Sequence, residues 1–244
     1  MKFTDQGIII NIKNYGEGSA IVKVISKDHG ICQAFVKFAT SKKVKAIYQI
    51  GNLISFEYRS RVDDNLGSFF AVDLVSSYLG KIMFDKDRLN CARCLFFTID
   101  QAFLEREEQQ ILFAELIDFL DKINDEKSNF REIIADYVKL ELSILNILGY
   151  GVDLLSCAVT NSNQNLAFVS PKSARAVCYE AGLPYASKLL VLPNFLIAND
   201  VEFSRQDLLN GLKLSGYFLS KHVFEDDERF FKVRESIGLF GKDV

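Results

Sequence analysis

The chain of 244 residues has little of what marks several protein classes. It has only three prolines and no low-complexity tract, so collagen-like and proline-rich disordered chains are excluded. No apolar run approaches the roughly 20 residues that a membrane-spanning helix needs. The five cysteines are an odd number without dense clustering, which indicates reduced thiols rather than a disulfide framework. The first residues do not resemble a signal peptide, and we expect a cytoplasmic protein.

Motifs of catalysis are also missing. The two histidines lie far apart in the sequence, and there is neither a Gly-x-Ser-x-Gly elbow nor a Walker lysine motif. We therefore expect no catalytic residue, no cofactor and no enzymatic activity.

The residues that are present describe a folded protein with an uneven charge. Hydrophobic residues make up 49% and charged residues 25%, which suffices for a core without disulfides or metals. Up to Ser76 there are ten Lys and Arg against seven acids, whereas the remainder carries 19 against 25. This asymmetry hints at an anion-binding module joined to a second region.

Five short segments in residues 1–78 show the alternation of β-strands. They are residues 8–12, 21–24, 31–38, 54–59 and 70–74. We expect the core face of the first to carry Ile8, Ile10 and Ile12, and that of the last to carry Phe70, Val72 and Leu74. Turn residues such as Gly16, Gly30 and Gly51 separate the segments. This spacing favours a five-stranded oligonucleotide-binding (OB-fold) barrel, although a small SH3-like barrel fits the same pattern.

From residue 79 the hydrophobic period becomes helical. Apolar stripes run through residues 112–123 and 133–148, and Gly149 is expected to end the second helix. An irregular segment, residues 152–199, contains all three prolines. Ser204 and Asp207 predict a capping box that opens a last helix reaching about His222. We thus predict an α+β protein with domains at 1–78 and 79–244.

The most chemically distinctive feature of the first domain is a lysine-rich segment. Four lysines fall within nine residues, namely Lys37, Lys42, Lys43 and Lys45, with the hydroxyls of Thr40 and Ser41 nearby. Ammonium groups at this density attract phosphates, and Arg59 and Arg61 would extend the patch. Tyr15, Phe35 and Tyr48 are aromatics that could stack on bases. The alternative is that the lysines are merely solvated and the aromatics belong to the core.

Cys91 and Cys94 have the spacing of a metal or redox pair, but they fall in a predicted helix. A structural zinc needs about four ligands, and the remaining cysteines are unpaired in sequence. We favour buried thiols that pack as small apolar residues. A redox enzyme that uses Cys91 and Cys94 is the competing interpretation.

Several segments, taken in order, resemble the RecO family of bacterial recombination-repair mediators. They are residues 7–10, 15–19, 28–30, 36–43, 50–52, 148–154, 168–177 and 180–185. Each segment alone is weak, whereas the ordered set covers most of the chain.

The resemblance implies an N-terminal OB-fold barrel followed by a mostly helical domain with an irregular, zinc-ribbon-like insertion. It implies a nucleoid-associated mediator that binds single- and double-stranded DNA and anneals complementary strands. It also implies two protein partners, RecR and the acidic C-terminal tail of single-stranded-DNA-binding protein, and the loading of RecA onto coated strands. An OB-fold adaptor for RNA or translation is the alternative.

The chain departs from the family at two places. The family often has Lys-Gly-Ala-Arg-Ser where this chain has Lys37-Phe38-Ala39-Thr40-Ser41, so a glycine and an arginine are missing. Some relatives carry a four-cysteine zinc site, but Thr160 stands where the partner of Cys157 would be. We therefore predict that this protein lacks zinc.

A partner tail that is acidic and ends in apolar residues needs a cation beside a hydrophobic groove. The resemblance places a basic residue at Lys139, our first choice for that cation. Lys221 and Arg229, near the last helix, are weaker candidates. The alternative is that Lys139 only solubilises its helix.

Overall fold

The computed structural model describes residues 1–61, 66–105, 107, 109–198, 202–225 and 227–237, without the side chain of Lys43. The chain divides into two compact units, Met1–Glu126 and Lys127–Val244. Strand gives way to helix between Ser77 and Tyr78, so the expected domain boundary at residue 78 falls inside the first unit and stays a prediction. Among the described residues, no helix is both long and apolar enough to cross a bilayer.

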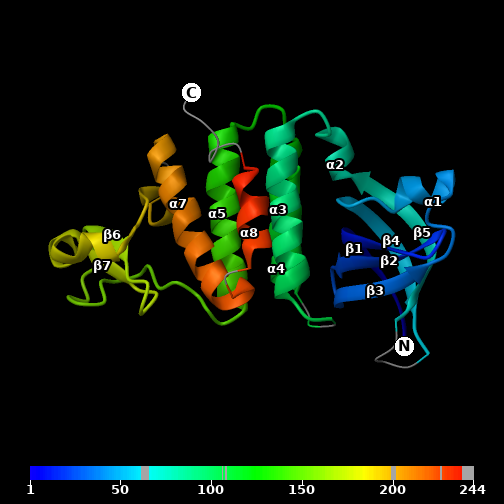
Figure 1. Cartoon of the computed structure of the whole chain (residues 1–244), viewed down its shortest axis with the longest axis horizontal. Helices are drawn as coiled ribbons and strands as arrows, with labels where there is room; N and C mark the ends of the chain where they lie inside the picture. Colours follow the sequence, from blue (N-terminus) through cyan, green and yellow to red (C-terminus); the bar gives the residue numbers. More distant parts are fainter. Residues whose placement is uncertain (62–65, 106, 108, 199–201, 226, 238–244) are drawn as a thin grey trace. The chain divides into compact units, whose positions relative to one another are not determined.

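The first unit is built on a five-stranded antiparallel sheet. Its strands are β1 (Lys2–Tyr15), β2 (Ser19–Ser26), β3 (Gly30–Val36), β4 (Asn52–Arg59) and β5 (Ser68–Ser77), in the order β3-β2-β1-β4-β5. The sheet curls so that its two edge strands, β3 and β5, come together. A hydrogen bond marks this contact, in which the Phe35 N–H on β3 donates to the carbonyl of Gly67, just before β5, over 2.9 Å. Together with the helices this confirms an α+β chain (Figure 1).

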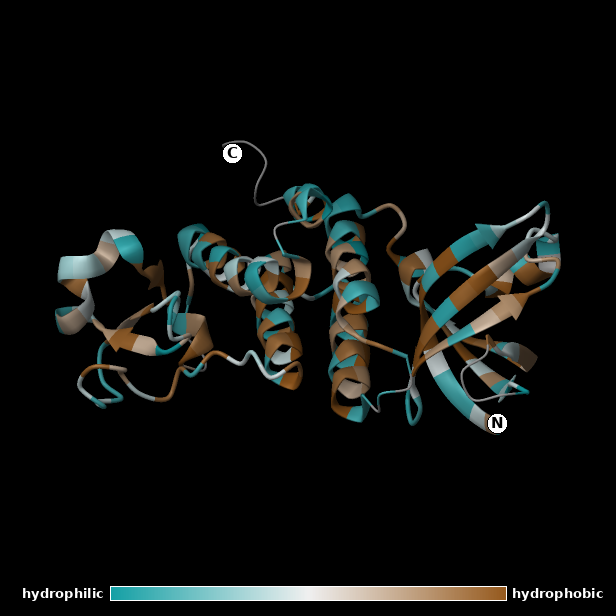
Figure 2. Cartoon of the chain, turned by 60° about the horizontal axis from the view of Figure 1, so that its bottom comes forward, coloured by the Kyte–Doolittle hydropathy of each residue, from teal (hydrophilic) through white to brown (hydrophobic). Residues whose placement is uncertain are grey.

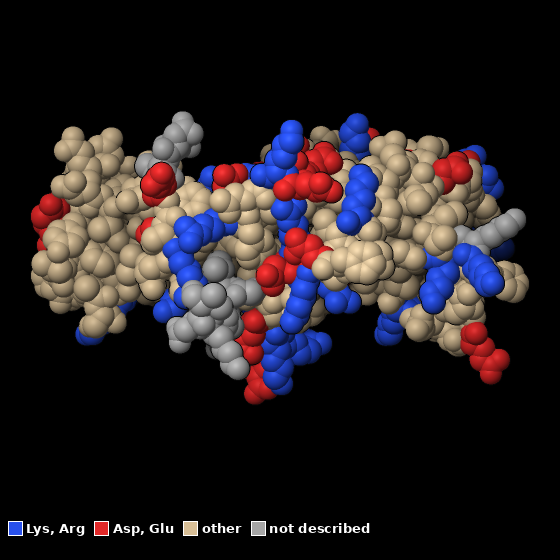
Figure 3. Space-filling model, turned by 90° about the horizontal axis from the view of Figure 1, so that it is seen from above, with Lys and Arg blue, Asp and Glu red and all other residues tan. Residues whose placement is uncertain are grey.

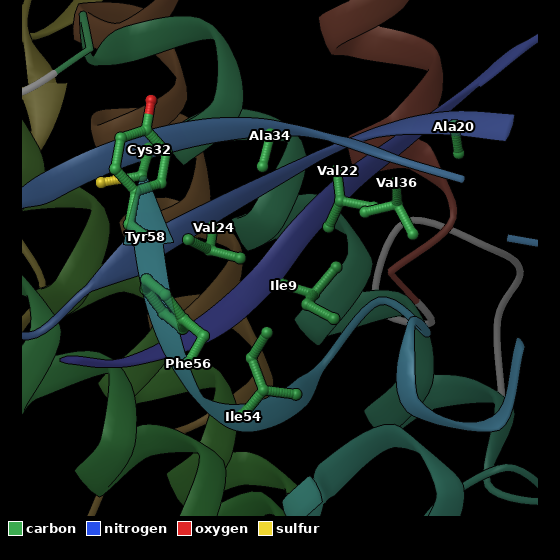
Figure 4. Packing of buried hydrophobic residues seen from close by; sticks show 10 residues of the cluster. All are labelled: Ile9, Ala20, Val22, Val24, Cys32, Ala34, Val36, Ile54, Phe56 and Tyr58. Atoms are coloured by element: carbon green, nitrogen blue, oxygen red, sulfur yellow. The ribbon is translucent and has the colours of Figure 1, made fainter. Parts of the chain in front are cut away.

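Hydrophobic and hydrophilic stretches are interspersed along the strands of this curled sheet (Figure 2). The buried cluster of Figure 4 consists of Ile9, Ala20, Val22, Val24, Cys32, Ala34, Val36, Ile54, Phe56 and Tyr58. The prediction that β4 turns Ile54, Phe56 and Tyr58 to the core is confirmed.

Two irregularities overturn the predicted faces of β1 and β5. A register shift between Ile9 and Asn11 turns Ile9 and Ile12 toward the same core, rather than Ile8, Ile10 and Ile12. Ile8 and Ile10 are nevertheless buried, since helix α3 packs on β1. Such a bulge inserts one residue and inverts the alternation beyond it.

The second irregularity lies in β5, where Ala71 has a φ of +46°. The register with β4 shifts at this point, so Phe69 and Val72 pack against the core. Phe70 and Leu74, which we expected inside, are 42% and 45% exposed.

The helices of the first unit are α1 (Lys42–Ile47), α2 (Tyr78–Lys81), α3 (Lys86–Ala102) and α4 (Gln110–Asn124). Polar contacts attach the end of α3 to the outside of the sheet. Lys23 pairs with Asp100 over 2.8 Å, and the amide of Asn11 donates to the same carboxylate over 2.7 Å. Cys91 and Cys94 are buried within α3, as the packing interpretation predicted.

The second unit contains α5 (Phe130–Ile147), α7 (Arg205–Leu219), a π-helical turn η3 (Ser220–Phe224) and α8 (Glu228–Glu235). The predicted capping box of Ser204 and Asp207 is present. Helix α5 ends as predicted at Gly149, with a φ of +83°, and the Tyr150 N–H donates to the Leu145 carbonyl over 2.8 Å. This pattern is a Schellman motif.

The segment predicted as irregular, whose last residue 199 lies outside the described residues, holds a small sheet. Its strands are β6 (Leu166–Val169), β7 (Ala176–Cys178) and β8 (Leu190–Val191), in the order β7-β6-β8. The short helical elements α6 (Tyr179–Gly182) and η1 (Leu183–Lys188) lie between β7 and β8, and η2 (Asn194–Leu196) follows β8. We call residues 152–198 the ribbon segment.

A buried ion pair joins α5, α7 and α8. The Arg234 guanidinium donates to the Glu141 carboxylate at 2.5 and 3.1 Å, to the Leu212 carbonyl and to the Ser215 hydroxyl. Glu141 is fully buried and Arg234 is 6% exposed. Burial alone would lower the pKa of Arg234, but the charge and hydrogen bonds of Glu141 raise it, so the guanidinium stays charged.

Candidate nucleic-acid interface and peptide groove

The predicted lysines leave the end of β3 and enter helix α1. Lys37 lies in the turn after β3, and Lys42 and Lys45 lie on α1; all three side chains are exposed. In the described part of the chain, none of these three makes an ion pair with a carboxylate. The backbone of Lys43 belongs to α1, while its side chain lies outside the described residues. We call residues 37–45 the lysine segment.

A buried asparagine fixes the far end of this segment. The Asn52 amide is 1% exposed and donates to the carbonyls of Ala46 and Ile47 over 3.1 and 2.8 Å, so it caps the end of α1. Gly51 has a φ of +81°, which a residue with a side chain rarely adopts. The Ile50-Gly51-Asn52 motif thus holds the lysine helix against β4.

Phe38 occupies the position at which relatives often have glycine. Its φ is +56°, so the backbone keeps the left-handed conformation of the missing glycine. For an L-residue this conformation costs roughly 1–2 kcal/mol. The ring is nevertheless 73% exposed between Lys37 and the start of α1, so burial of the side chain does not offset the strain.

Other aromatics divide between surface and core. Tyr15 is 61% exposed and packs edge-to-face on Phe35, with ring centroids 5.7 Å apart. The hairpin turn after Tyr15 approaches the lysine segment, since a Cβ on Gly18 would lie 3.6 Å from the Thr40 hydroxyl. Burial raises the pKa of Tyr48 to about 12, and its ring packs on the core. Tyr48 is therefore not an open stacking platform.

Arg59 ends β4 beside the closing contact of the sheet, because it pairs in register with Ser68. Its guanidinium forms an ion pair with Glu57 and lies 4.4 Å from the centroid of the Phe70 ring. The hydrogen bond from Arg59 lowers the pKa of the Glu57 carboxyl. Arg61 is exposed beyond the end of β4, so the two arginines that we expected to extend the patch do not lie on one strand face.

The charges of the remaining surface are mixed. On the face shown in Figure 3, lysine and arginine side chains are interspersed with acidic ones. Exposed lysines such as Lys13, Lys27 and Lys172 also make no ion pair among the described residues. The lysine segment differs from them because several such lysines lie within nine residues.

A groove of about 640 Å³ lies between α7, η3 and α8 in the second unit. Its lining residues are Leu212, Lys213, Gly216, Tyr217, Ser220, Lys221, Phe231, Arg234 and Glu235. Tyr217 and Phe231 are 39% and 44% exposed, so the groove offers aromatic surface to a partner. Lys213 and Lys221 are exposed and supply the positive charge.

The three predicted tail-binding cations differ in their surroundings. Lys221 lines the groove, and its ammonium donates to the Pro171 carbonyl over 3.1 Å. Lys139 on α5 pairs with Asp136 over 3.6 Å and is not a lining residue. Arg229 forms a two-pronged contact with Asp227 at 2.5 and 2.8 Å.

Models of known protein families match both the N-terminal and the C-terminal part of the chain. A family model described as Recombination protein O N terminal matches residues 1–78, and one described as Recombination protein O C terminal matches residues 83–229. The chain belongs to the RecO family, as its motifs predicted.

Individual relatives agree with this result. DNA repair protein RecO of Rickettsia typhi is 37% identical over 237 residues, which are 97% of this chain and 98% of that protein. DNA repair protein RecO of Rickettsia akari is 36% identical over 94% of each chain. That of Rickettsia canadensis is 37% identical over 93% of this chain and 91% of its own. The family names indicate a role in DNA repair and recombination, and they do not favour the RNA adaptor.

Proposed function

We propose that the curled sheet is an OB-fold barrel. Three features support this proposal: the strand order, the contact of β3 with Gly67 just before β5, and helix α1 between β3 and β4. The closing bridge of Ala34 and Gly67 is parallel, whereas the paired strands of the sheet are antiparallel. Barrels of this kind commonly bind oligonucleotides on one face.

The proposed function is that of a recombination mediator that binds single- and double-stranded DNA and anneals complementary strands. The observation that carries the proposal is that Lys37, Lys42 and Lys45 are exposed and make no ion pair with a carboxylate among the described residues. The DNA-binding residues are Lys37, Lys42, Lys43, Lys45, Arg59 and Arg61. Because Arg59 already pairs with Glu57, it contributes less than the lysines.

Annealing on this surface needs no bond chemistry. Two DNA strands repel each other through their phosphates, and ammonium groups that neutralise both lower this repulsion. The encounter of complementary strands then becomes faster without a catalytic residue. We accordingly propose that the protein is not an enzyme. We also propose that it is associated with the nucleoid because it binds DNA.

Phe38 and Tyr15 add a preference for single strands. A base stacked on an exposed aromatic contributes about 1–3 kcal/mol, and only unpaired bases present their faces. Phe38 belongs to the lysine segment, Tyr15 precedes the hairpin turn that approaches it, and both rings are more than half exposed.

We propose that the groove between α7 and α8 receives the acidic tail of single-stranded-DNA-binding protein. The tail requires a cation beside an apolar channel, and Lys221 with Lys213 meets this requirement beside Tyr217 and Phe231. Lys221 therefore replaces Lys139 as our first choice. RecR is the second proposed partner, and loading of RecA is the proposed outcome.

The test is annealing of complementary strands coated with single-stranded-DNA-binding protein, compared with the same protein lacking its tail. We expect the chain to accelerate annealing of bare strands, and to accelerate that of coated strands only when the tail is present.

Equal acceleration with and without the tail would contradict the tail contact. No acceleration of bare strands would contradict the annealing function. A higher affinity for structured RNA than for single-stranded DNA would favour the RNA adaptor.

A further inference from the structure

Two cysteines of the ribbon segment lie side by side although 21 residues separate them in sequence. The sulfurs of Cys157 and Cys178 are 3.5 Å apart. The side chains are 0% and 4% exposed. Cys178 ends β7, and Cys157 begins the turn that runs to Ser162, whose carbonyl accepts from the Cys157 N–H over 2.8 Å.

The Cys157 sulfur lies in a ring of hydrogen-bond donors. The N–H groups of Val159, Thr160 and Cys178 point at it over 3.4, 3.5 and 3.2 Å. Three donors on one sulfur stabilise the thiolate, which accepts hydrogen bonds more strongly than a thiol. Burial raises the pKa of Cys157, but the hydrogen bonds of Thr160, Cys178 and Val159 together outweigh it and lower the pKa to about 6.

The same residues do not fit the four-cysteine zinc site that some relatives carry. A structural zinc takes four sulfur, nitrogen or carboxylate ligands in a tetrahedron. The Thr160 hydroxyl lies near the Cys178 sulfur, at 3.8 Å, where a third thiolate would be needed. Among the described residues, no cluster of three or more Cys, His, Asp or Glu residues could hold a metal.

We propose that Cys157 and Cys178 form a peroxide-reactive dithiol that closes to a disulfide. The Cys157 thiolate attacks one oxygen of a hydroperoxide such as hydrogen peroxide. The S–O bond forms, the O–O bond breaks, and hydroxide leaves, giving a sulfenic acid. The Cys178 sulfur then attacks the Cys157 sulfur, so that the S–S bond forms and the S–O bond breaks.

The atoms and electrons of these steps balance. The second hydroxide takes the proton of Cys178, and the first takes the proton that Cys157 had released. The two thiols lose two electrons, and the peroxide gains them and ends as two waters. No further reductant or metal is required.

The location of the pair permits the reaction. Val159 and Thr160, whose N–H groups contact the Cys157 sulfur, are both exposed, so the turn around this sulfur lies at the protein surface. Hydrogen peroxide is close to water in size and can reach such a site. Cys91 and Cys94, at 0% and 1% exposure, sit inside helix α3 and provide an internal control.

The test uses the full chain, reduced, freed of reductant and treated with increasing hydrogen peroxide. Thiols are counted after denaturation, and digested peptides are analysed by mass spectrometry. We expect two of the five thiols to disappear, one peptide pair joined through Cys157 and Cys178, and full recovery with dithiothreitol. Cys178→Ser should stop the reaction at a sulfenic acid on Cys157, which a dimedone probe traps.

The double variant Cys91→Ser/Cys94→Ser is the matched control and should still lose two thiols. Retention of all five thiols at peroxide concentrations that oxidise an exposed model thiol would overturn the proposal. A disulfide between Cys91 and Cys94 in place of Cys157 and Cys178 would also overturn it. Both readouts are made on wild-type protein as well, so a variant that fails to fold does not decide the matter.

Discussion

The lysine segment of the first unit and the ion pairs of Lys139, Arg229 and Arg234 in the second use positive charge in opposite ways. In the first unit, the lysine segment projects exposed ammonium groups that have no described carboxylate partner. In the second, Lys139 and Arg229 pair with acids two or three residues away, and Arg234 is buried against Glu141. The first arrangement leaves the charge available to a polyanion, whereas the second uses it for the fold. From this contrast we infer that the partners of a cation, as well as its position in the sequence, should be considered when a ligand-binding role is proposed.

The largest effect is expected from breaking the buried pair. Arg234→Met leaves the Glu141 carboxylate buried without its partner, and removing one member of a buried pair costs about 3–5 kcal/mol. Urea unfolding should show this loss of stability. Arg229→Met is the matched control, since its solvent-exposed pair with Asp227 contributes little to stability. Similar losses in the two variants would contradict the distinction between structural and surface cations.

A smaller effect is expected at Phe38. Phe38→Gly removes the strained left-handed residue and should stabilise the first unit by roughly 1 kcal/mol. The same change should weaken single-strand binding by about 1–3 kcal/mol, the contribution of one stacked base, and leave duplex binding unchanged. Thermal unfolding and fluorescence anisotropy measure the two effects.

Phe84→Ala provides the control for that experiment, because Phe84 is 94% exposed but follows α2 rather than the lysine segment. Its removal should leave DNA affinity unchanged. An equal loss in both variants would mean that exposed aromatics bind DNA without regard to the lysines.

The smallest effect is expected at the peptide groove. Lys221→Glu places a negative charge beside the acidic tail and should weaken binding of a fluorescent tail peptide roughly tenfold, or about 1.4 kcal/mol. Lys139→Glu should bind like the wild type, because Lys139 does not line the groove. The reverse result would return the site to α5, where the family resemblance first placed it.

The sequence predicted elements whose signals are local. The capping box at Ser204 and the helix end at Gly149 depend on a few neighbouring residues, and both are present. The predicted inward faces of β1 and β5 were right at Ile12 and Val72 and wrong at the other positions, because a shift in register inverts the alternation and has no composition signal of its own.

The parts of the candidate sites that could not be predicted depend on tertiary contacts. From the sequence, Phe38 is only a departure from the family pattern, which has glycine there. The backbone shows that Phe38 has the left-handed conformation that glycine favours. The groove joins Tyr217 to Phe231 across two helices, and the thiol pair joins Cys157 to Cys178 across the ribbon segment. Neither juxtaposition follows from spacing along the chain.

The central claim is that the exposed lysine segment binds the phosphates of DNA. Its most direct test is the salt dependence of single-strand affinity for the variant Lys42→Ala/Lys43→Ala/Lys45→Ala. Each lost phosphate contact should reduce the slope of log K against log salt by about 0.7, so the triple variant should lose about two units. A matched variant without the exposed Lys139, Lys188 and Lys232 of the second unit should keep the wild-type slope. An unchanged slope in the first variant, or an equal loss in the second, would contradict the account.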